Sequence, residues 1–288
     1  MKTNRKLILP VAMVALLLSS VFYSCSSDSI LTQIFSNEVT ALERLDSANA
    51  QAKREYGDST ELVLIYGRNV KTNGKADMSA LEIITSGNLD SVGSWVYTFK
   101  APSSSSFRLY TPDPIPGQTD CINLTEFFNP LDLLNLIADT SAANIIEGAL
   151  ELVINSNLKI TTPRNLLIDS DAALNLANTE SQIIKFNTNF EPNISSTNGN
   201  LFFQSGTNKE VNVFLIPAAG TLHLPTFITE LLDFPADLWI VNYKKTNTQG
   251  NPESMVLATV VQSNQTMGLS NFPNFSSRVI NLSKFFAN

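Results

Sequence analysis

Acidic side chains provide the one arrangement in this sequence that fits a common hydrolytic mechanism. Two carboxyl groups that flank a glycosidic bond can cleave it, one as the acid and the other as base or nucleophile. The candidate acids are Asp169 with Asp171, Glu191, and Glu230 with Asp233 or Asp237. Because an acidic protein carries many such residues on its solvated surface, we favour a surface role for them over catalysis.

Histidine and cysteine are too scarce for most other catalytic sites. His223 is the single histidine among 288 residues, so no site with several histidine ligands can form, and its alternating segment favours a packed or edge position. Cys121 stands beside Ile122, and we expect a small buried residue there rather than a nucleophile. The sequence contains no Gly-x-Ser-x-Gly elbow, phosphate-binding glycine loop or dinucleotide fingerprint. We therefore predict no catalytic, metal-binding or cofactor-binding residue, and no cofactor.

The first 25 residues have the pattern of a secretory leader. Three basic residues precede an apolar run over residues 7–21, and small residues then lead to Cys25. The run of about fifteen residues is shorter than the roughly twenty that a membrane-crossing helix needs. We therefore predict a cleaved signal peptide over residues 1–24.

Residues 22–25, with the sequence Phe-Tyr-Ser-Cys, resemble the lipobox of bacterial lipoproteins, in which a small residue precedes a cysteine that is acylated. Ser24 fits this pattern, whereas Phe22 and Tyr23 depart from its commonest form. The resemblance implies a Bacteroidota-like lipoprotein whose Cys25 carries palmitate-type chains that hold it in the cell envelope, at the outer membrane. The alternative is cleavage after Ser26, which would discard Cys25 and release a soluble protein.

Four Asp-Ser-x triplets are similar to the O-glycosylation signal of Bacteroidota envelope proteins. This resemblance implies that four serines lie on the surface, outside the cytoplasm: Ser29, Ser47, Ser59 and Ser91. The triplet is short and also arises by chance, so both interpretations stay open.

Composition limits the partners of the processed chain. Residues 1–24 contain three basic and no acidic residues, so the remainder has 16 Lys and Arg against 26 Asp and Glu, a net charge of about −10. An acidic surface repels phosphate backbones, and no basic stripe with interleaved aromatic residues occurs, so we predict no nucleic-acid partner. We expect contact with the membrane through the lipid alone and an envelope protein as the binding partner.

The elements that position these residues indicate an α+β fold. We expect a polar tether over residues 25–36, a lobe with an N-terminal helix and a β-hairpin over residues 37–120, and central helices with a larger antiparallel sheet over residues 121–288. Turn residues at short spacing favour antiparallel meanders over βαβ crossovers.

The N-terminal helix is the first element that the pattern predicts. Apolar residues recur at spacings of three and four from Val39 onward, which indicates a helix capped by Ser36 or Asn37 and ended by Gly57. A short apolar run at 61–66 then predicts a strand.

An aromatic hairpin follows at residues 94–100 and 107–111. In its first arm Trp95, Tyr97 and Phe99 share one face, because successive strand side chains point to opposite sides. We favour packing of this face on a helix over a role in gripping a sugar or peptide.

Helices and then strands are predicted in the second lobe. Three prolines at residues 111–121 favour a stiff connection from the sheet to central helices within residues 123–154. Asp169 or Ser170 is expected to cap a short helix at 171–178. Strand-type runs then occur at 183–190, 201–204, 211–216, 222–224, 239–244, 255–262 and 278–282.

Two segments of the chain parallel each other. Residues 95–100 read Trp-Val-Tyr-Thr-Phe-Lys and residues 239–244 read Trp-Ile-Val-Asn-Tyr-Lys. A candidate helix precedes each one, beginning near Asp77 and near Asp169. The pattern resembles PepSY-like modules of bacterial envelope proteins, which implies a repeated helix-plus-hairpin unit, although chance also explains so short a match.

Together these patterns predict a non-catalytic binding or scaffolding lipoprotein of the envelope. The alternatives are a carboxylate-dependent hydrolase of envelope glycans and an extracytoplasmic sensor or inhibitor module of PepSY-like kind.

Overall fold

The computed structural model describes residues 38–77, 95–101, 107–113, 119–126, 168–180, 209–217, 236–246, 249–250, 252–263 and 275–283. All of them belong to the unit Glu38–Asn288, one of two into which the chain divides. The predicted signal peptide at 1–24, the tether at 25–36 and most of the expected central helical region lie outside the described residues.

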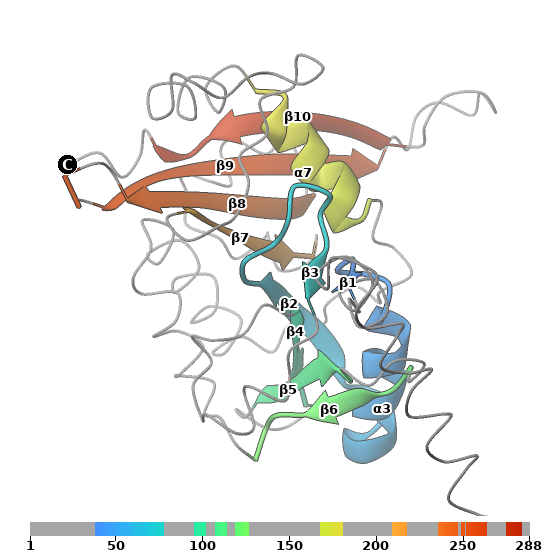
Figure 1. The fold of residues 1–288 in the computed structure, drawn as a ribbon. Coiled ribbons are helices and arrows are strands. Elements are labelled where there is room, and N and C mark those ends of the chain that lie inside the picture. The colour runs from blue at the N-terminus through green and yellow to red at the C-terminus, as the bar shows by residue number, and fades with distance from the viewer. Residues whose placement is uncertain are drawn as a thin grey trace, which may run out of the picture. The chain divides into compact units, whose positions relative to one another are not determined.

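Eight antiparallel strands form the main sheet, in the spatial order β10-β9-β8-β7-β2-β4-β5-β6 (Figure 1). One half contains β2 (Glu61–Gly67), β4 (Trp95–Lys100), β5 (Phe107–Pro112) and β6 (Cys121–Asn123). The other half contains β7 (Lys209–Ile216), β8 (Asp237–Thr246), β9 (Pro252–Ser263) and β10 (Phe275–Asn281). The described part of the chain is thus α+β, with the sheet as its dominant element.

Most of the predicted strands that can be compared are confirmed. The hairpin expected at 94–100 and 107–111 is the antiparallel pair β4–β5. The runs expected at 61–66, 211–216, 239–244, 255–262 and 278–282 coincide with β2, β7, β8, β9 and β10. The runs expected at 183–190, 201–204 and 222–224 lie outside the described residues.

Two helices of the described residues pack against this sheet. The helix α3 (Leu45–Tyr56) lies beside β4, β5 and β6, and α7 (Ser170–Asn178) lies beside β8, β9 and β10 (Figure 1). Each helix turns mostly small side chains toward the strands, which permits a close approach. The buried apolar helix residues are Leu45, Ala48 and Ala52 in α3, and Ala173, Leu174 and Ala177 in α7.

The predicted aromatic face of the first hairpin packs on the helical side of the sheet. Trp95, Tyr97 and Phe99 are fully buried in the same hydrophobic cluster as the buried residues of both helices. The Trp95 ring lies where a side chain on Gly67 would be, so the glycine permits this packing. Its indole Nε1 donates a hydrogen bond to the Val39 carbonyl oxygen at 2.8 Å. The expectation that this face packs on a helix is confirmed.

The two halves of the sheet have the same plan. In each, a helix precedes four strands that pair in chain order, and the two first strands, β2 and β7, pair antiparallel at the centre. We call this central β2–β7 pairing the seam. Tyr66 lies opposite Phe214 there, and their rings stack with centroids 4.8 Å apart. The order of helix and strands is therefore the same in both halves, counted outward from this residue pair.

The strand register extends this equivalence to the two parallel sequence segments. Trp95 lies opposite Gly67 on β2, and Trp239 lies opposite Leu215 on β7. Gly67 and Leu215 each follow the paired central aromatic residue by one position, so the two tryptophans have the same register position relative to the seam. Residues 95–98 and 239–242 therefore occupy equivalent register positions in the two halves, and an irregularity between Leu62 and Leu64 shifts the register after them.

The predicted start of the first helix is wrong. Glu38–Val39 forms β1, which pairs with β3 (Ala76–Asp77), and α3 begins only at Leu45. Tertiary hydrogen bonds hold the intervening backbone in a non-helical path, as described below. The predicted end is confirmed, because Gly57 follows the helix with a φ of 101°, a conformation that favours glycine.

The proline-rich connection also differs from its prediction. It joins β5 to the neighbouring strand β6 rather than to a helix, and the Asp113 amide donates to the Asp120 carbonyl oxygen at 3.1 Å. The described proline of this connection, Pro112, ends β5 opposite Cys121 on β6, where its fixed φ fits an extended strand. By contrast, the short helix capped by Asp169 is confirmed as α7.

Candidate functional site

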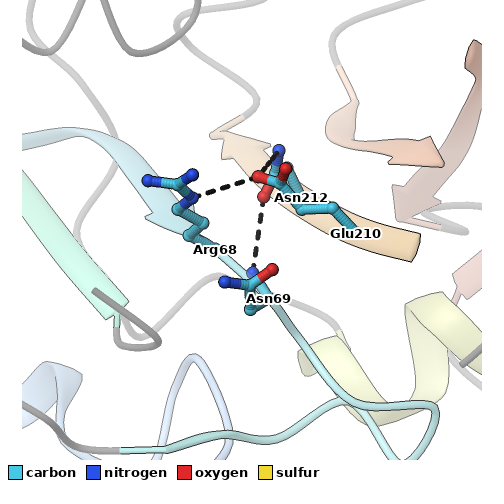
Figure 2. Close-up of polar contacts among 4 residues, drawn as sticks. All are labelled: Arg68, Asn69, Glu210 and Asn212. Atoms are coloured by element: carbon cyan, nitrogen blue, oxygen red, sulfur yellow. Dashed lines mark hydrogen bonds and ion pairs between the residues drawn. The ribbon is translucent and has the colours of Figure 1, made fainter. Parts of the chain in front are cut away.

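Four polar residues meet where the two halves of the sheet join, and we call them the seam cluster: Arg68, Asn69, Glu210 and Asn212 (Figure 2). Arg68 Nε donates a hydrogen bond to Glu210 Oε1 at 3.0 Å, and Asn212 Nδ2 donates to the same oxygen at 2.8 Å. The Asn69 amide is 3.4 Å from Asn212 Oδ1, which accepts it. The cluster thus links the end of β2 to the start of β7.

The backbone at the end of β2 positions these groups. Asn69 has a φ of 50°, in the left-handed region that asparagine tolerates better than most residues, and the next amide, that of Val70, donates to the Val211 carbonyl oxygen at 2.8 Å. The side chains of Arg68 and Glu210 are 18% and 24% exposed. The ion pair is therefore partly buried, and together with the Asn69–Asn212 bond it holds the end of β2 against the start of β7.

Asn242 on β8 lies directly opposite Asn212 and is fully buried. Within the described part of the chain, neither its Oδ1 nor its Nδ2 has a hydrogen-bond partner. Thr98, which follows Trp95 as Asn242 follows Trp239, is also buried with an unpartnered hydroxyl among the described residues. Such groups destabilise a fold by about 1–3 kcal/mol each. Other buried polar atoms without a partner among the described residues include Tyr97 Oη and Trp239 Nε1.

A second polar group, which we call the clamp, consists of Thr40, Ala41, Leu42, Asp169 and Ser170. Asp169 accepts hydrogen bonds from Thr40 Oγ1 at 2.6 Å and from the Leu42 amide at 3.0 Å, and also caps α7 by accepting from the Ser170 amide at 2.6 Å. Ser170 Oγ accepts from the Ala41 amide at 2.9 Å. These bonds satisfy amide groups that a longer N-terminal helix would have used, which explains the late start of α3.

The candidate acids occupy separate structural positions. Asp169 belongs to the clamp, whereas Asp171 is exposed and accepts from the Ala172 amide of its own helix turn at 2.6 Å. Asp237 is buried at the start of β8. The remaining candidates, Glu191, Glu230 and Asp233, lie outside the described residues.

Cys121 is buried, as its sequence context predicts. Burial raises the pKa of its thiol to about 12, so the group is protonated at neutral pH. Its Sγ lies 3.9 Å from the Arg44 carbonyl oxygen. The single histidine, His223, and the expected lipidation site, Cys25, lie outside the described residues.

A polar turn borders the clamp. Asn73 Oδ1 accepts from the Lys75 amide at 3.1 Å, and the Gly74 carbonyl oxygen accepts from Ser170 Oγ at 2.6 Å. A shallow open pocket of about 440 Å³ lies between this turn and α7, lined by Thr72, Asn73, Asp171, Ala172 and Asn175. The described residues contain no group of three or more His, Cys, Asp or Glu side chains able to hold a metal ion.

The serines of the Asp-Ser-x triplets differ in accessibility. Ser59 is exposed in the turn after α3, whereas Ser47 is half-buried within that helix. Ser29 and Ser91 lie outside the described residues. Ser59 is therefore the described triplet serine that a modifying enzyme reaches most easily.

Sequence reasoning missed the seam cluster and Asn242. The available signal is a polar residue that interrupts an apolar strand: Asn212 stands between Val211 and Val213, and Asn242 between Val241 and Tyr243. This pattern marks a position of interest, but it does not reveal which strands pair or which amide is left without a partner.

Comparison with known proteins does not assign the chain to a family. No protein-family model, no curated protein and no solved structure matches the chain. Among the described residues, no helix has the length and apolar character needed to cross a membrane.

Proposed function

We propose that the protein is a non-catalytic binding or scaffolding protein of the cell envelope, anchored by lipid on Cys25. The observation that carries the proposal is the position of Asp169, a leading candidate acid. Its two oxygens accept hydrogen bonds from Thr40, Leu42 and Ser170. A carboxylate engaged in this way stabilises the fold and is poorly placed to act on a substrate.

The proposed anchor brings this fold close to a membrane. The described fold begins at Glu38, so residues 26–37 separate it from Cys25. At roughly 3.3–3.6 Å per residue, these twelve residues span at most about 43 Å. The proposed partner is therefore a component of the same envelope layer.

A protein partner fits the chain better than nucleic acid does. The net charge of about −10 after removal of residues 1–24 opposes binding to phosphate backbones. No basic patch in the sequence offsets this repulsion.

The second candidate is an extracytoplasmic sensor or inhibitor module of PepSY-like kind. The equivalent positions of Trp95 and Trp239 in two halves of the same plan favour it. A captured partner that is an envelope enzyme, and whose activity falls on binding, would support this candidate.

Crosslinking in intact cells tests the proposal. A photoreactive residue is placed at Ser59 or at Asp171, both exposed, and adducts are identified by mass spectrometry in cells that make the protein at its native level. We expect the same envelope protein in replicate experiments, and its loss or reduction in the Cys25→Ala variant. Replicates without any adduct at either position would contradict a binding role.

A further inference from the structure

Residues 38–42 contact both halves of the sheet, and we call this segment the strap. On the side of the first half, Glu38 forms an ion pair with Lys71, and the Val39 carbonyl oxygen accepts from Trp95 Nε1 at 2.8 Å. The strap also supplies β1, which pairs with β3 in the connection between β2 and β4. These contacts fix its first two residues to the N-terminal half.

The rest of the strap is held by the second half. Thr40 and Leu42 donate hydrogen bonds to Asp169, and Ala41 donates to Ser170, at the start of α7. The Ala41–Ser170 bond is buried, and the side chain of Ser170 also reaches the Gly74 carbonyl oxygen at 2.6 Å. Five consecutive residues therefore bridge the two halves through main-chain and side-chain bonds.

The seam that the strap bridges is short. β2 and β7 pair along three residues of each strand, whereas β7 and β8 pair along the whole of β7. Beyond the three pairs, the described contacts across the seam include the Val70–Val211 hydrogen bond, the Tyr66–Phe214 stack and the partly exposed seam cluster. In the described sheet only the pairing of the edge strand β6 with β5 is as short, and the seam is the place where a local opening separates the two halves.

We propose that the strap is a brace that keeps the seam closed, so that release of the clamp opens the β2–β7 pairing before the rest of the sheet unfolds. The strap is the first segment of the described fold, and β1 at its start holds it to the first half of the sheet before the clamp holds it to the second. The brace does not depend on whether Cys25 carries lipid.

Hydrogen exchange on the full chain tests this brace. Asp169→Ala removes the two carboxylate oxygens that accept the bonds from Thr40 and Leu42. Asp171→Ala is the matched control, because it removes a carboxylate two residues away whose described bond is to the next amide, that of Ala172. We expect Asp169→Ala to accelerate amide exchange at least tenfold in the strap, β2 and β7, with unchanged exchange in β8 and β9. The control should match the wild type in all of these segments.

Two results would overturn the brace. Acceleration confined to the first turn of α7 would show that Asp169 is only a helix cap, and equal acceleration in every strand would show a loss of global stability instead. If Asp169→Ala does not fold, Thr40→Val, which removes one clamp bond and keeps the branched shape, should give the same pattern with a smaller change. Absence of that pattern in a folded Thr40→Val protein would also contradict the proposal.

Discussion

Replacing Asn242 with leucine should stabilise the protein, although the residue lies in the centre of the sheet. Its carboxamide is fully buried, and neither polar atom has a partner in the described part of the chain. Leucine has the same branching as asparagine but no group that needs a hydrogen bond. The directly opposite residue, Asn212, is equally buried and provides a matched control.

The magnitude follows from the hydrogen bonds of the two asparagines. Removing the unpartnered group at Asn242 relieves a penalty of about 1–3 kcal/mol. Asn212→Leu instead loses the bonds to Glu210 at 2.8 Å and to the Asn69 amide at 3.4 Å, together worth about 1–2 kcal/mol. Because both variants add the same volume to neighbouring positions, the cost of extra volume largely cancels in their difference. Asn242→Leu should therefore be more stable than Asn212→Leu by about 2–5 kcal/mol.

Urea unfolding of the wild type and both variants, followed by tryptophan fluorescence, measures this difference. Equal m-values are required so that the midpoints report stability alone. If Asn242→Leu loses as much stability as Asn212→Leu, then Asn242 has a polar partner in the folded protein and the reasoning is refuted.

Two further perturbations have defined outcomes. Gly67→Ala places a methyl group inside the space of the Trp95 ring, so the free energy of unfolding should fall by about 1–3 kcal/mol, and an unchanged urea midpoint would contradict the described packing. Burial raises the pKa of the Cys121 thiol from its usual value near 9 to about 12, so the folded state favours the neutral thiol. The contribution of this pKa shift to the free energy of unfolding is complete below pH 9 and is lost as the pH rises toward 12. The stability of the wild type relative to Cys121→Ala should therefore decrease between pH 9 and 11, and a constant difference would contradict the buried position.

Local sequence patterns predicted the elements that depend on interactions between neighbouring residues. The cap at Asp169 and the helix α7 depend on neighbouring residues, and the strands of the second half follow from runs of apolar residues between turn residues. The aromatic face of β4 follows from the alternation of strand side chains. These features need no knowledge of distant parts of the chain.

Hydrogen bonds between residues far apart in the sequence determine the features that sequence reasoning missed. The start of α3 depends on clamp bonds between Thr40 and Asp169, which are 129 positions apart. The seam cluster joins Arg68 to Glu210 across 142 positions. Periodicity carries no information on such pairings, so the late start of α3 and the seam cluster emerged only from the tertiary structure.

Metabolic labelling with radioactive palmitate tests the central claim, that this fold is held in the envelope through Cys25, most directly. The wild type is compared with Cys25→Ala and with Cys121→Ala, which removes the buried cysteine as a matched control. We predict label in the wild type and in Cys121→Ala, and none in Cys25→Ala. Equal label in all three proteins, or no label in the wild type, would contradict the anchor.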